Sequence, residues 1–367
     1  MSIYDVRISR IRDWMKERNV EVVLVTSPPN VFYLTGFDCH PHERFMALCL
    51  YASGTEALFV PTLEKEAAEK SGFSRIVTVS DTDNPMDKVR DVVGDGPFGS
   101  LAIEKQHLTV ARLEQLQTVF GTEPTVAAED LLLGMRLQKD EAEIAIMKKA
   151  AEIADRGVEA AIRAIEVGRT EAELVTIIES TMKSLGASGT SFSTLVLTGE
   201  KSALPHGTPG TRAIQAGDFV LLDLGAVYEG YCSDITRTVV VGEPSDEQLI
   251  IYEAVLAANL AGIAATKAGL PAKVVDAAAR QTIEGFGYGE FFTHRVGHGL
   301  GIEVHEFPSM HGNNEQELVP GMVFTIEPGI YLPNIGGVRI EDDVLVTENG
   351  VEILTSYPKE LQILPAN

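Results

Sequence analysis

Hydrophobic positions recur with two different spacings in the first third of the chain. Ile8, Ile11 and Met15 lie three and four residues apart, which is typical of one buried face of a helix. Short continuous apolar runs alternate with such stretches, and this alternation predicts strands separated by helices, as in an α/β domain. The segment PPN at residues 28–30 predicts an irregular break after the first strand. The expected strands are 21–26, 44–51, 56–60, 75–79 and 100–103, and the expected helices are 5–18, 63–71, 85–93 and 108–118.

The alternation of short strands and helices ends near residues 127–138, where an acidic stretch leads into the apolar segment LLLGM. We expect the first domain to span residues 1–130 and the second to span residues 139–367. The second domain begins with a long alanine-rich helix that runs to about residue 165. Capping boxes, in which Ser or Thr is followed three residues later by Glu or Gln, predict two further helix starts. They stand at Thr170–Glu173 and Ser245–Gln248, and Pro271 predicts the start of one more helix.

A strand-forming run, Phe219–Val241, holds the most informative polar positions. Both of its ends are rich in apolar or β-branched residues, and Gly225 and Gly230 bracket its middle, so it predicts a hairpin or short meander. Asp223 and Asp234 would then lie opposite or diagonal to each other on one face, about 4.5–8 Å apart. Two ionised carboxylates in an apolar setting repel each other and need a cation or a shared proton. For this pair alone, a cap, a turn residue or a solvated edge charge is the simpler explanation.

Length, charge and cysteine content limit the classes of function. The 367 residues, 45% of them hydrophobic, suffice for two packed domains. The formal net charge of -23 repels phosphate backbones and anionic lipids, so we expect no nucleic-acid partner and no membrane association. The same charge suits divalent cations, although solubility explains most of it. We expect a cytoplasmic protein, because three cysteines are too few for a disulfide framework and the first residues lack the apolar core of a signal peptide.

Three more ligand-type side chains occur downstream in apolar or glycine-rich surroundings. His298 stands in GHGLG, Glu327 follows the uncharged run MVFTI, and Glu341 follows VRI. Taken singly, Glu327 could form a salt bridge with Arg339, and His298 could be satisfied by a backbone carbonyl. Together with the two aspartates of the central run, however, they provide four carboxylates and one imidazole. This set suits two divalent first-row ions better than a lone structural zinc.

Such a set predicts hydrolytic chemistry. Two divalent ions about 3.5–4 Å apart can hold a bridging water, lower its pKa and present hydroxide to a carbonyl or phosphoryl centre. His206 and His305 are further imidazoles that could stabilise a tetrahedral intermediate or move a proton to the leaving amine.

The ordered motifs DLG, SDITRT, GHGLG, TIEPGIY and RIEDD resemble the dinuclear site of the pita-bread metallopeptidases. The chain as a whole is similar to the Xaa-Pro dipeptidase (prolidase) and Xaa-Pro aminopeptidase branch of that family, because NVFYLTGF at residues 30–37 is similar to its creatinase-type N-terminal domain. Methionine aminopeptidase, which usually lacks this domain, fits less well. The resemblance implies an α/β creatinase-like N-terminal domain followed by an α+β pita-bread catalytic domain.

The resemblance also implies roles for the residues of these motifs and for two divalent metal ions. The expected ion is manganese, with cobalt or zinc as alternatives, and the expected substrate is a small peptide with proline at its second position. The implied metal ligands are Asp223, Asp234, His298, Glu327 and Glu341, the implied catalytic residues are His206, His305 and Glu327, the implied substrate contacts are His294 and His305, and Arg339 supports the metal-binding carboxylates.

The loop at residues 36–44 concentrates His40 and His42, and we weigh a substrate contact by His40 against an ordinary solvated loop histidine. The resemblance implies a homodimer in which the N-terminal domain of one subunit approaches the active site of the other, with residues 38–44 as the candidate contact. Some prolidases have an Arg at the position of Ser309, where it anchors the carboxylate of a dipeptide, and Ser cannot replace it. The sequence therefore leaves dipeptidase and aminopeptidase activity open.

Two other functions remain as alternatives. The same hydroxide could attack phosphorus, which would make the protein an organophosphorus ester hydrolase. A metal-free pita-bread binding protein is the third possibility, but such relatives lose ligands, and all five ligand positions stand here. A creatine-type amidinohydrolase is disfavoured for the same reason.

Overall fold

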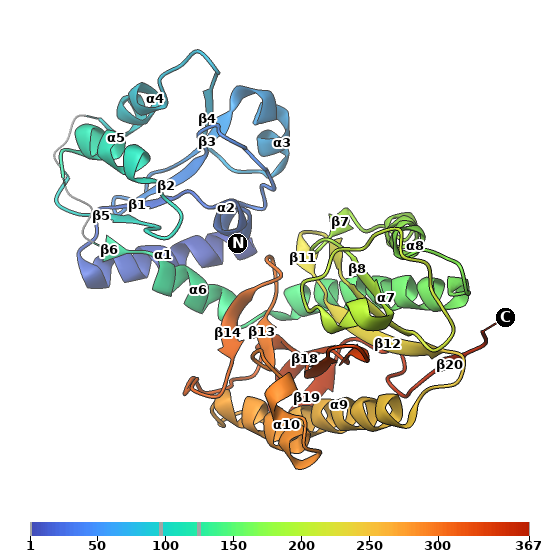
Figure 1. Cartoon of the computed structure of the whole chain (residues 1–367). Helices are drawn as coiled ribbons and strands as arrows, with labels where there is room; N and C mark the ends of the chain where they lie inside the picture. The colour runs from blue at the N-terminus through green and yellow to red at the C-terminus, as the bar shows by residue number, and fades with distance from the viewer. Residues whose placement is uncertain (1, 95–97, 123–125, 367) are drawn as a thin grey trace. The chain divides into compact units, whose positions relative to one another are not determined.

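The computed structural model describes residues 2–94, 98–122 and 126–366. The chain folds into two compact units, Met1–Arg136 and Leu137–Asn367 (Figure 1). Each unit has a hydrophobic core of its own, as expected for a chain of this length.

The first unit is built on a six-stranded sheet with the strand order β4-β3-β2-β1-β5-β6. Strands β1 and β5 are parallel neighbours, whereas β1 and β2 run antiparallel. Val89 of α4 and Leu116 of α5 belong to the same buried cluster as Val22 and Leu24 of β1, so these two helices cover one face of the sheet. The strands are β1 (Val22–Val25), β2 (Ala47–Tyr51), β3 (Glu56–Pro61), β4 (Ile76–Val79), β5 (Leu101–Ile103) and β6 (Val126–Ala127), and the helices are α1 (Ile3–Arg18), η1 (Thr62–Glu64), α3 (Lys65–Lys70), α4 (Pro85–Val93) and α5 (Val110–Phe120).

Two more helices of this unit occupy segments without a predicted helix. Helix α2 (Pro28–Thr35) has prolines at its first two positions, where the missing N–H costs no intrahelical hydrogen bond. Helix α6 (Glu129–Leu137) covers the apolar LLLGM segment. The Tyr33 hydroxyl of α2 donates to the Met135 carbonyl oxygen of α6 at 2.9 Å. The predicted break at residues 28–30 is therefore wrong, and the first unit reaches Arg136, beyond residue 130, because α6 is bonded to it.

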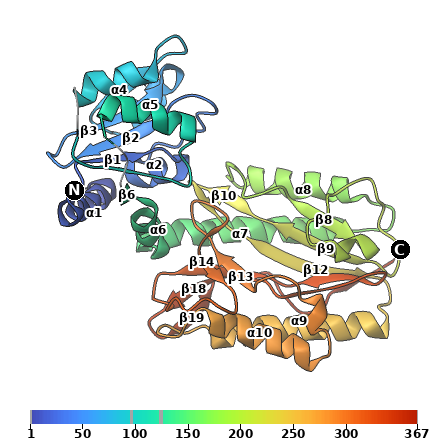
Figure 2. The same ribbon diagram turned by 60° about the vertical axis from the view of Figure 1, so that its left-hand side comes forward.

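The second unit places its strands between two pairs of helices (Figure 2). On one side, Ala154 of α7 and Ile178 of α8 share a buried cluster with Leu222 of β9. On the other side, Val255 of α9 and Ile283 of α10 belong to a second core cluster. The helices are α7 (Glu141–Ala164), α8 (Glu171–Ser184), η2 (Gly199–Ala203), α9 (Asp246–Ala265), α10 (Lys273–Gly285) and η3 (Gly289–Phe291).

The larger sheets of this unit have the strand orders β20-β12-β9-β8 and β14-β13-β15-β18-β19, and the smaller ones are β11-β10-β7 and β16-β17. The strands are β7 (Gly189–Thr190), β8 (Leu195–Thr198), β9 (Phe219–Leu224), β10 (Ala226–Tyr228), β11 (Tyr231–Cys232), β12 (Ile235–Val241), β13 (Gly297–Gly299), β14 (Glu306–Met310), β15 (Val323–Ile326), β16 (Gly329–Leu332), β17 (Gly336–Arg339), β18 (Asp342–Thr347), β19 (Gly350–Ile353) and β20 (Ile363–Leu364).

The central run forms the predicted hairpin. Strands β9 and β12 pair antiparallel with Asp223 opposite Thr236. Asp234 immediately precedes β12, so the two aspartates are diagonal to each other rather than directly opposite. Between these strands, β10 and β11 pair across Glu229 and Gly230, whose φ angles of 46° and 82° are typical of a type I′ turn.

Helix α9 has the length and apolar composition of a membrane-spanning helix, but half of its most apolar window is buried inside the unit. Its capping box at Ser245–Gln248 is confirmed, as is the one at Thr170–Glu173 that opens α8. The buried Asn259 donates from Nδ2 to Asp342 Oδ2 at 3.1 Å. These contacts are those of a core helix.

Arg237 of β12 is a fully buried cation that ties β12 to the start of β18. Its Nη2 donates to Asp342 Oδ1 at 2.8 Å, and its Nη1 donates to the Glu341 carbonyl oxygen at 2.6 Å. Lys359 donates to the other carboxylate oxygen of Asp342 at 2.6 Å. Burial alone would raise the pKa of Asp342, but Arg237 and Lys359 together lower it. Arg237 therefore fixes the backbone on which Glu341 stands.

Replacing Arg237 by Met should lower the free energy of unfolding by about 3–5 kcal/mol, because it leaves part of a buried negative charge uncompensated. Arg163→Met is the matched control, since the Arg163 side chain is 77% exposed in its pair with Glu159. The control should change stability by about 1 kcal/mol at most. Urea unfolding of both variants at equal metal loading measures the difference, and equal stability of the two would contradict the structural role of Arg237.

Candidate functional site

A cavity of about 690 Å³ in the second unit gathers every predicted site residue except His40. Its polar lining comes from loops and strand ends of several different strands. The predicted residues that line it are Asp223, Asp234, His298, Glu327, Glu341, His206, His294, His305 and Arg339.

Strand pairing explains why residues so far apart in the sequence meet here. Ile326 of β15 pairs with Asp342 of β18 in an antiparallel ladder. Glu327 and Glu341 each lie one residue beyond that pair, so they are neighbours at the same end of the ladder. His298 is the middle residue of β13, which pairs with β15 next to it.

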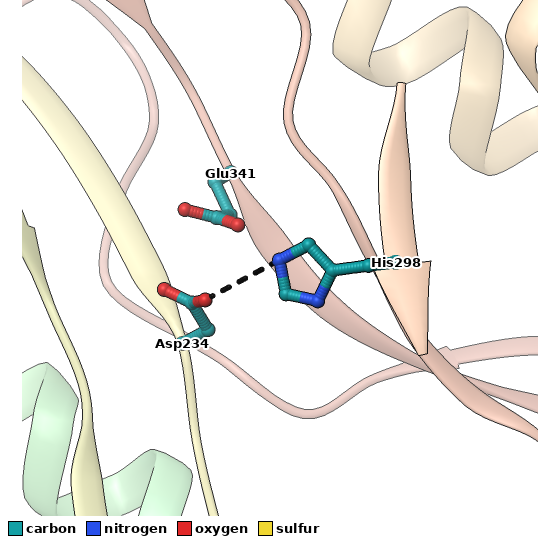
Figure 3. Close-up of side chains that lie close together, drawn as sticks. All are labelled: Asp234, His298 and Glu341. Carbon is teal, nitrogen blue, oxygen red and sulfur yellow. Dashed lines mark ion pairs between the residues drawn. The ribbon is translucent and has the colours of Figure 1, made fainter. Parts of the chain in front are cut away.

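His298 points into a group of carboxylates (Figure 3). One ligand-type atom from each of Asp234, His298 and Glu341 lies within 4.8 Å of the other two. The Nε2 atom of His298 is 3.7 Å from Asp234 Oδ2 and 3.5 Å from Glu327 Oε1. Its Nδ1 is 3.2 Å from the Gly299 carbonyl oxygen. A backbone carbonyl therefore accounts for only one ring nitrogen, and the other faces the carboxylates, as in metal-binding histidines.

Asp223 is held by Arg339. The Arg339 Nη2 donates to Asp223 Oδ2, its Nε donates to Thr236 Oγ1 at 3.1 Å, and its Nη1 donates to the Tyr331 hydroxyl at 2.9 Å. Among the residues that the structure describes, no ion pair joins Arg339 to Glu327. The salt bridge considered for Glu327 from the sequence is therefore made by Asp223 instead.

The pKa values of the cluster show a shortage of positive charge. Burial, followed by repulsion from neighbouring carboxylates, raises the pKa values of Asp234 and Glu341 well above their ordinary range. Burial raises the pKa of Glu327 to about 7 and lowers the pKa of His298 to about 3. The imidazole is thus neutral at physiological pH, and the carboxylates resist ionisation unless a cation joins them.

These residues fit a divalent metal site. The Oδ1 atoms of Asp223 and Asp234 are buried without a hydrogen-bond partner in the described part of the chain. Thr236 Oγ1 donates to Glu341 Oε2 at 2.6 Å, which orients that carboxylate toward the cluster. Carboxylate oxygens with one neutral imidazole suit divalent first-row cations, whose charge would compensate for the mutual repulsion.

Three predicted histidines lie around this cluster. The ring of His305 meets that of His298 edge to face, with centroids 4.1 Å apart, and His206 is exposed on the cavity wall. Burial lowers the pKa of His294 to about 4. His294 Nε2 lies 2.9 Å from the Tyr331 hydroxyl, which also accepts from Arg339.

Sequence reasoning missed two residues that line the cavity. The hydroxyl of Tyr331 lies between His294 and Arg339 and contacts both. Tyr331 is the last residue of the TIEPGIY motif, and this position could have indicated a role in the site. Arg295 donates from Nη1 to Ser309 Oγ at 2.8 Å. Its position next to His294 indicated that it could lie near the site, but only the fold shows that its guanidinium reaches Ser309.

His40 belongs to the first unit and lines a different cavity, whose lining residues all come from that unit. The described contacts of this chain therefore do not bring His40 to the carboxylate cluster. A contact with substrate remains a prediction.

The backbone beside His298 leaves no room for side chains. A Cβ atom at Gly297 would lie 1.9 Å from the Thr325 carbonyl oxygen, and one at Gly299 would lie 2.1 Å from the Phe307 carbonyl oxygen. Only glycine allows β13 to approach its two neighbours this closely. The packing of β13 therefore sets the position of the imidazole.

Comparison with known proteins gives two family matches that together cover most of the chain. Residues 145–348 match metallopeptidase family M24, and residues 7–138 match the creatinase/prolidase N-terminal domain. A relative from Bacillus subtilis (strain 168), YkvY, named as a proposed dipeptidase, is 46% identical over 361 residues, which are 98% of this chain and 99% of the relative.

Solved structures agree with these matches. The prolidase from Pyrococcus horikoshii OT3 aligns with a TM-score of 0.90 and 40% identity over 97% of this chain and 99% of its own. The X-Pro aminopeptidase from Thermotoga maritima MSB8 aligns with a TM-score of 0.89 and 34% identity over 97% of this chain and 99% of its own. The predicted family resemblance and the predicted pair of domain folds are confirmed.

Proposed function

Because this chain belongs to metallopeptidase family M24, we propose that it hydrolyses the peptide bond before proline, in dipeptides or at the N termini of peptides. One observation carries the proposal: four carboxylates and an imidazole Nε2, drawn from separate strands, converge on one cavity, and among the described residues only Asp223 is paired with an arginine. The prolidase and X-Pro aminopeptidase among the similar structures support the choice of substrate.

The metal content that we propose is two divalent ions, manganese in the first place and cobalt or zinc as alternatives. The proposed ligands are the carboxylates of Asp223, Asp234, Glu327 and Glu341 with the imidazole of His298. Bound divalent ions supply Lewis-acid activation of a water molecule and of the scissile carbonyl.

Glu327 is the residue that we assign to proton transfer. Its carboxylate lies at the end of β15 beside His298 Nε2, and Thr325 Oγ1 is 3.5 Å from Glu327 Oε1. A carboxylate beside the attacking water can accept a proton from it and release that proton later to the leaving amine.

We assign substrate positioning to the exposed imidazoles and to the chain of hydrogen bonds behind them. His305 and His206 line the cavity, where an imidazole N–H can donate to the developing oxyanion of the carbonyl. His294, Tyr331 and Arg339 form a connected line of polar groups on the same wall. Such a line holds its members in place and orients a substrate group bound against it.

Peptides of different length test the proposal and separate its two forms. Ala-Pro and Gly-Pro should be cleaved with added manganese or cobalt, and Ala-Ala should be cleaved at least about tenfold more slowly if the site selects proline. Cleavage of Ala-Pro-Ala would identify an aminopeptidase, and its resistance would identify a dipeptidase. Chromatographic detection of released alanine measures all four. Equal rates for Ala-Ala and Ala-Pro would contradict the proposed specificity.

The assembly and compartment are also proposals. We propose a homodimer in the cytoplasm, and sedimentation equilibrium should give twice the mass of one chain. The free and buried thiols of Cys39, Cys49 and Cys232 suit a reducing compartment. If residues 38–44 contact the active site of a partner copy, replacing His40 and His42 by Ala should change KM for peptide.

A further inference from the structure

Another cavity lies in the first unit, where two neighbouring parallel strands connect to opposite sides of the sheet. Strands β1 and β5 are parallel neighbours, yet β1 leads through α2 to β2 on one side, and β5 leads through α5 to β6 on the other. In open α/β sheets, the crevice outside the carboxyl ends of two such strands is the usual place for a ligand. Thr26 directly follows β1, and His107 lies in the loop after β5.

A cavity of about 590 Å³ occupies this place. Its volume is in the range of about 300–1,000 Å³ that small-molecule sites have. Five of its lining residues are basic, and one is acidic. The basic ones are His40, His42, Arg44, His107 and Arg112, and the acidic one is Glu43.

A buried carboxylate holds the segment that follows β1, next to the cavity. Glu104, 2% exposed, accepts from the backbone N–H of Ser27 at 2.8 Å and from Asn30 Nδ2 at 2.6 Å. Glu104 Oε2 is also 3.3 Å from Thr26 Oγ1, which lies 3.0 Å from His107 Nδ1. The His107 ring is therefore held through its Nδ1, so a ligand in the cavity would meet its Nε2.

The two arginines of the cavity are not equivalent. Arg44 is neutralised by Asp81, which accepts from its Nε at 2.7 Å and from its Nη2 at 3.2 Å. Arg112 is half-buried, lies over the Phe45 ring with 5.1 Å between the guanidinium carbon and the centroid, and donates to Gln115 Oε1 at 3.0 Å. Within the described residues no carboxylate pairs with Arg112, and burial lowers its pKa.

The start of helix α5 adds to this positive charge. Thr109 caps the helix, and Arg112 stands in its first turn, where there is no acidic residue. A cation at this end of a helix is opposed by the helix dipole, whereas an anion is attracted by it. In this acidic chain, Arg112 is a cation without a carboxylate partner among the described residues, whereas Asp81 neutralises Arg44 and Glu43 lines the same cavity.

We propose that this cavity binds a small molecule bearing a phosphate or carboxylate group, with the Arg112 guanidinium and the His107 imidazole as its main contacts. The flat Phe45 ring beneath Arg112 holds the guanidinium in place, and Arg112 keeps its charge at any physiological pH. The site shares no lining residue with the cavity of the carboxylate cluster, and anion binding by Arg112 requires no metal ion. Its His40 and His42 also belong to the loop that we propose to contact a partner copy.

Calorimetric titration of the metal-loaded protein tests this site, with inorganic phosphate and succinate as separate probes in chloride buffers of equal ionic strength. Saturable binding of phosphate alone, or of succinate alone, would identify the preferred oxyanion. Arg112→Gln should weaken that binding about tenfold or more, since hydrogen bonds to charged groups are strong. Arg112→Lys should retain part of it. Arg90→Gln is the matched control, because Arg90 lies in α4 of the same unit in an exposed pair with Asp87.

Three results would overturn the proposal. The first is the absence of saturable binding of either probe. The second is equal binding by wild-type protein and Arg112→Gln, provided that circular dichroism shows both to be folded. The third is binding that a competing peptide removes and Arg112→Gln does not, which would place the probe on the metal ions. Peptide hydrolysis is measured separately with Ala-Pro, so failure of this site and failure of the proposed function are distinguishable.

Discussion

Glu327→Gln should hydrolyse Ala-Pro about 10²–10⁴-fold more slowly than the wild-type protein, the range that general acid–base groups contribute. The amide is nearly isosteric with the carboxylate but cannot accept a proton from the attacking water. Its side chain also keeps an oxygen beside His298 Nε2, where Glu327 Oε1 now lies at 3.5 Å. Steady-state kinetics give kcat and KM, and metal analysis of the same sample shows whether the ions are still bound.

Glu348→Gln is the matched control for this measurement, because Glu348 is exposed and follows β18 in the same unit. It should leave kcat within about twofold, as surface substitutions have small effects. A fall in kcat with full metal content would support proton transfer by Glu327, and joint loss of metal and activity would support a ligand role. Wild-type activity in Glu327→Gln would contradict both roles.

Removing divalent ions should abolish peptide hydrolysis and also lower stability. A ligand present at a free concentration of 100 times its Kd stabilises the folded state by about 2.7 kcal/mol. Dialysis against a chelator should therefore lower the free energy of unfolding by about this amount. The physical reason is visible in the cluster: without a cation, burial and mutual repulsion raise the pKa values of Asp234 and Glu341. Activity and unfolding by urea are measured before and after manganese is restored.

The Asp234→Asn variant separates metal loss from other effects of the chelator. It removes one charge from the proposed ligands while keeping the size of the side chain. Its stability should therefore change less between chelated and metal-loaded samples than that of the wild-type protein. Hydrolysis that continues at the full rate in protein stripped below stoichiometric metal would refute the metal-dependent mechanism.

The central hairpin was predictable because its pattern is local. Strand-forming residues around Gly225 and Gly230 gave the reversal, and the reversal placed Asp223 near Asp234. The exact register, with Thr236 opposite Asp223, needed the fold. His298, Glu327 and Glu341 came from motif resemblance, since no local pattern shows that β13, β15 and β18 share one sheet.

The features that the sequence did not predict, helices α2 and α6 and the role of Tyr331, also have physical explanations. Prolines that read as a break begin helix α2, because the first turn of a helix needs no N–H from them. Helix α6 is held by long-range bonds, such as that from Arg136 to Asn30 Oδ1 at 2.9 Å, which no sequence window contains. The Tyr331 hydroxyl lies next to His294 Nε2 and accepts a hydrogen bond from Arg339. These contacts form only when the strands are folded together.

The glycines on either side of His298 also limit what laboratory evolution can achieve with this protein. A library that randomises codons 297 and 299 will consist largely of misfolded clones, since any other residue collides with backbone oxygens about 2 Å away. Diversity aimed at new substrates belongs instead on wall residues such as Phe192, Leu195 and Val304, which line the cavity and lie outside the proposed ligand set.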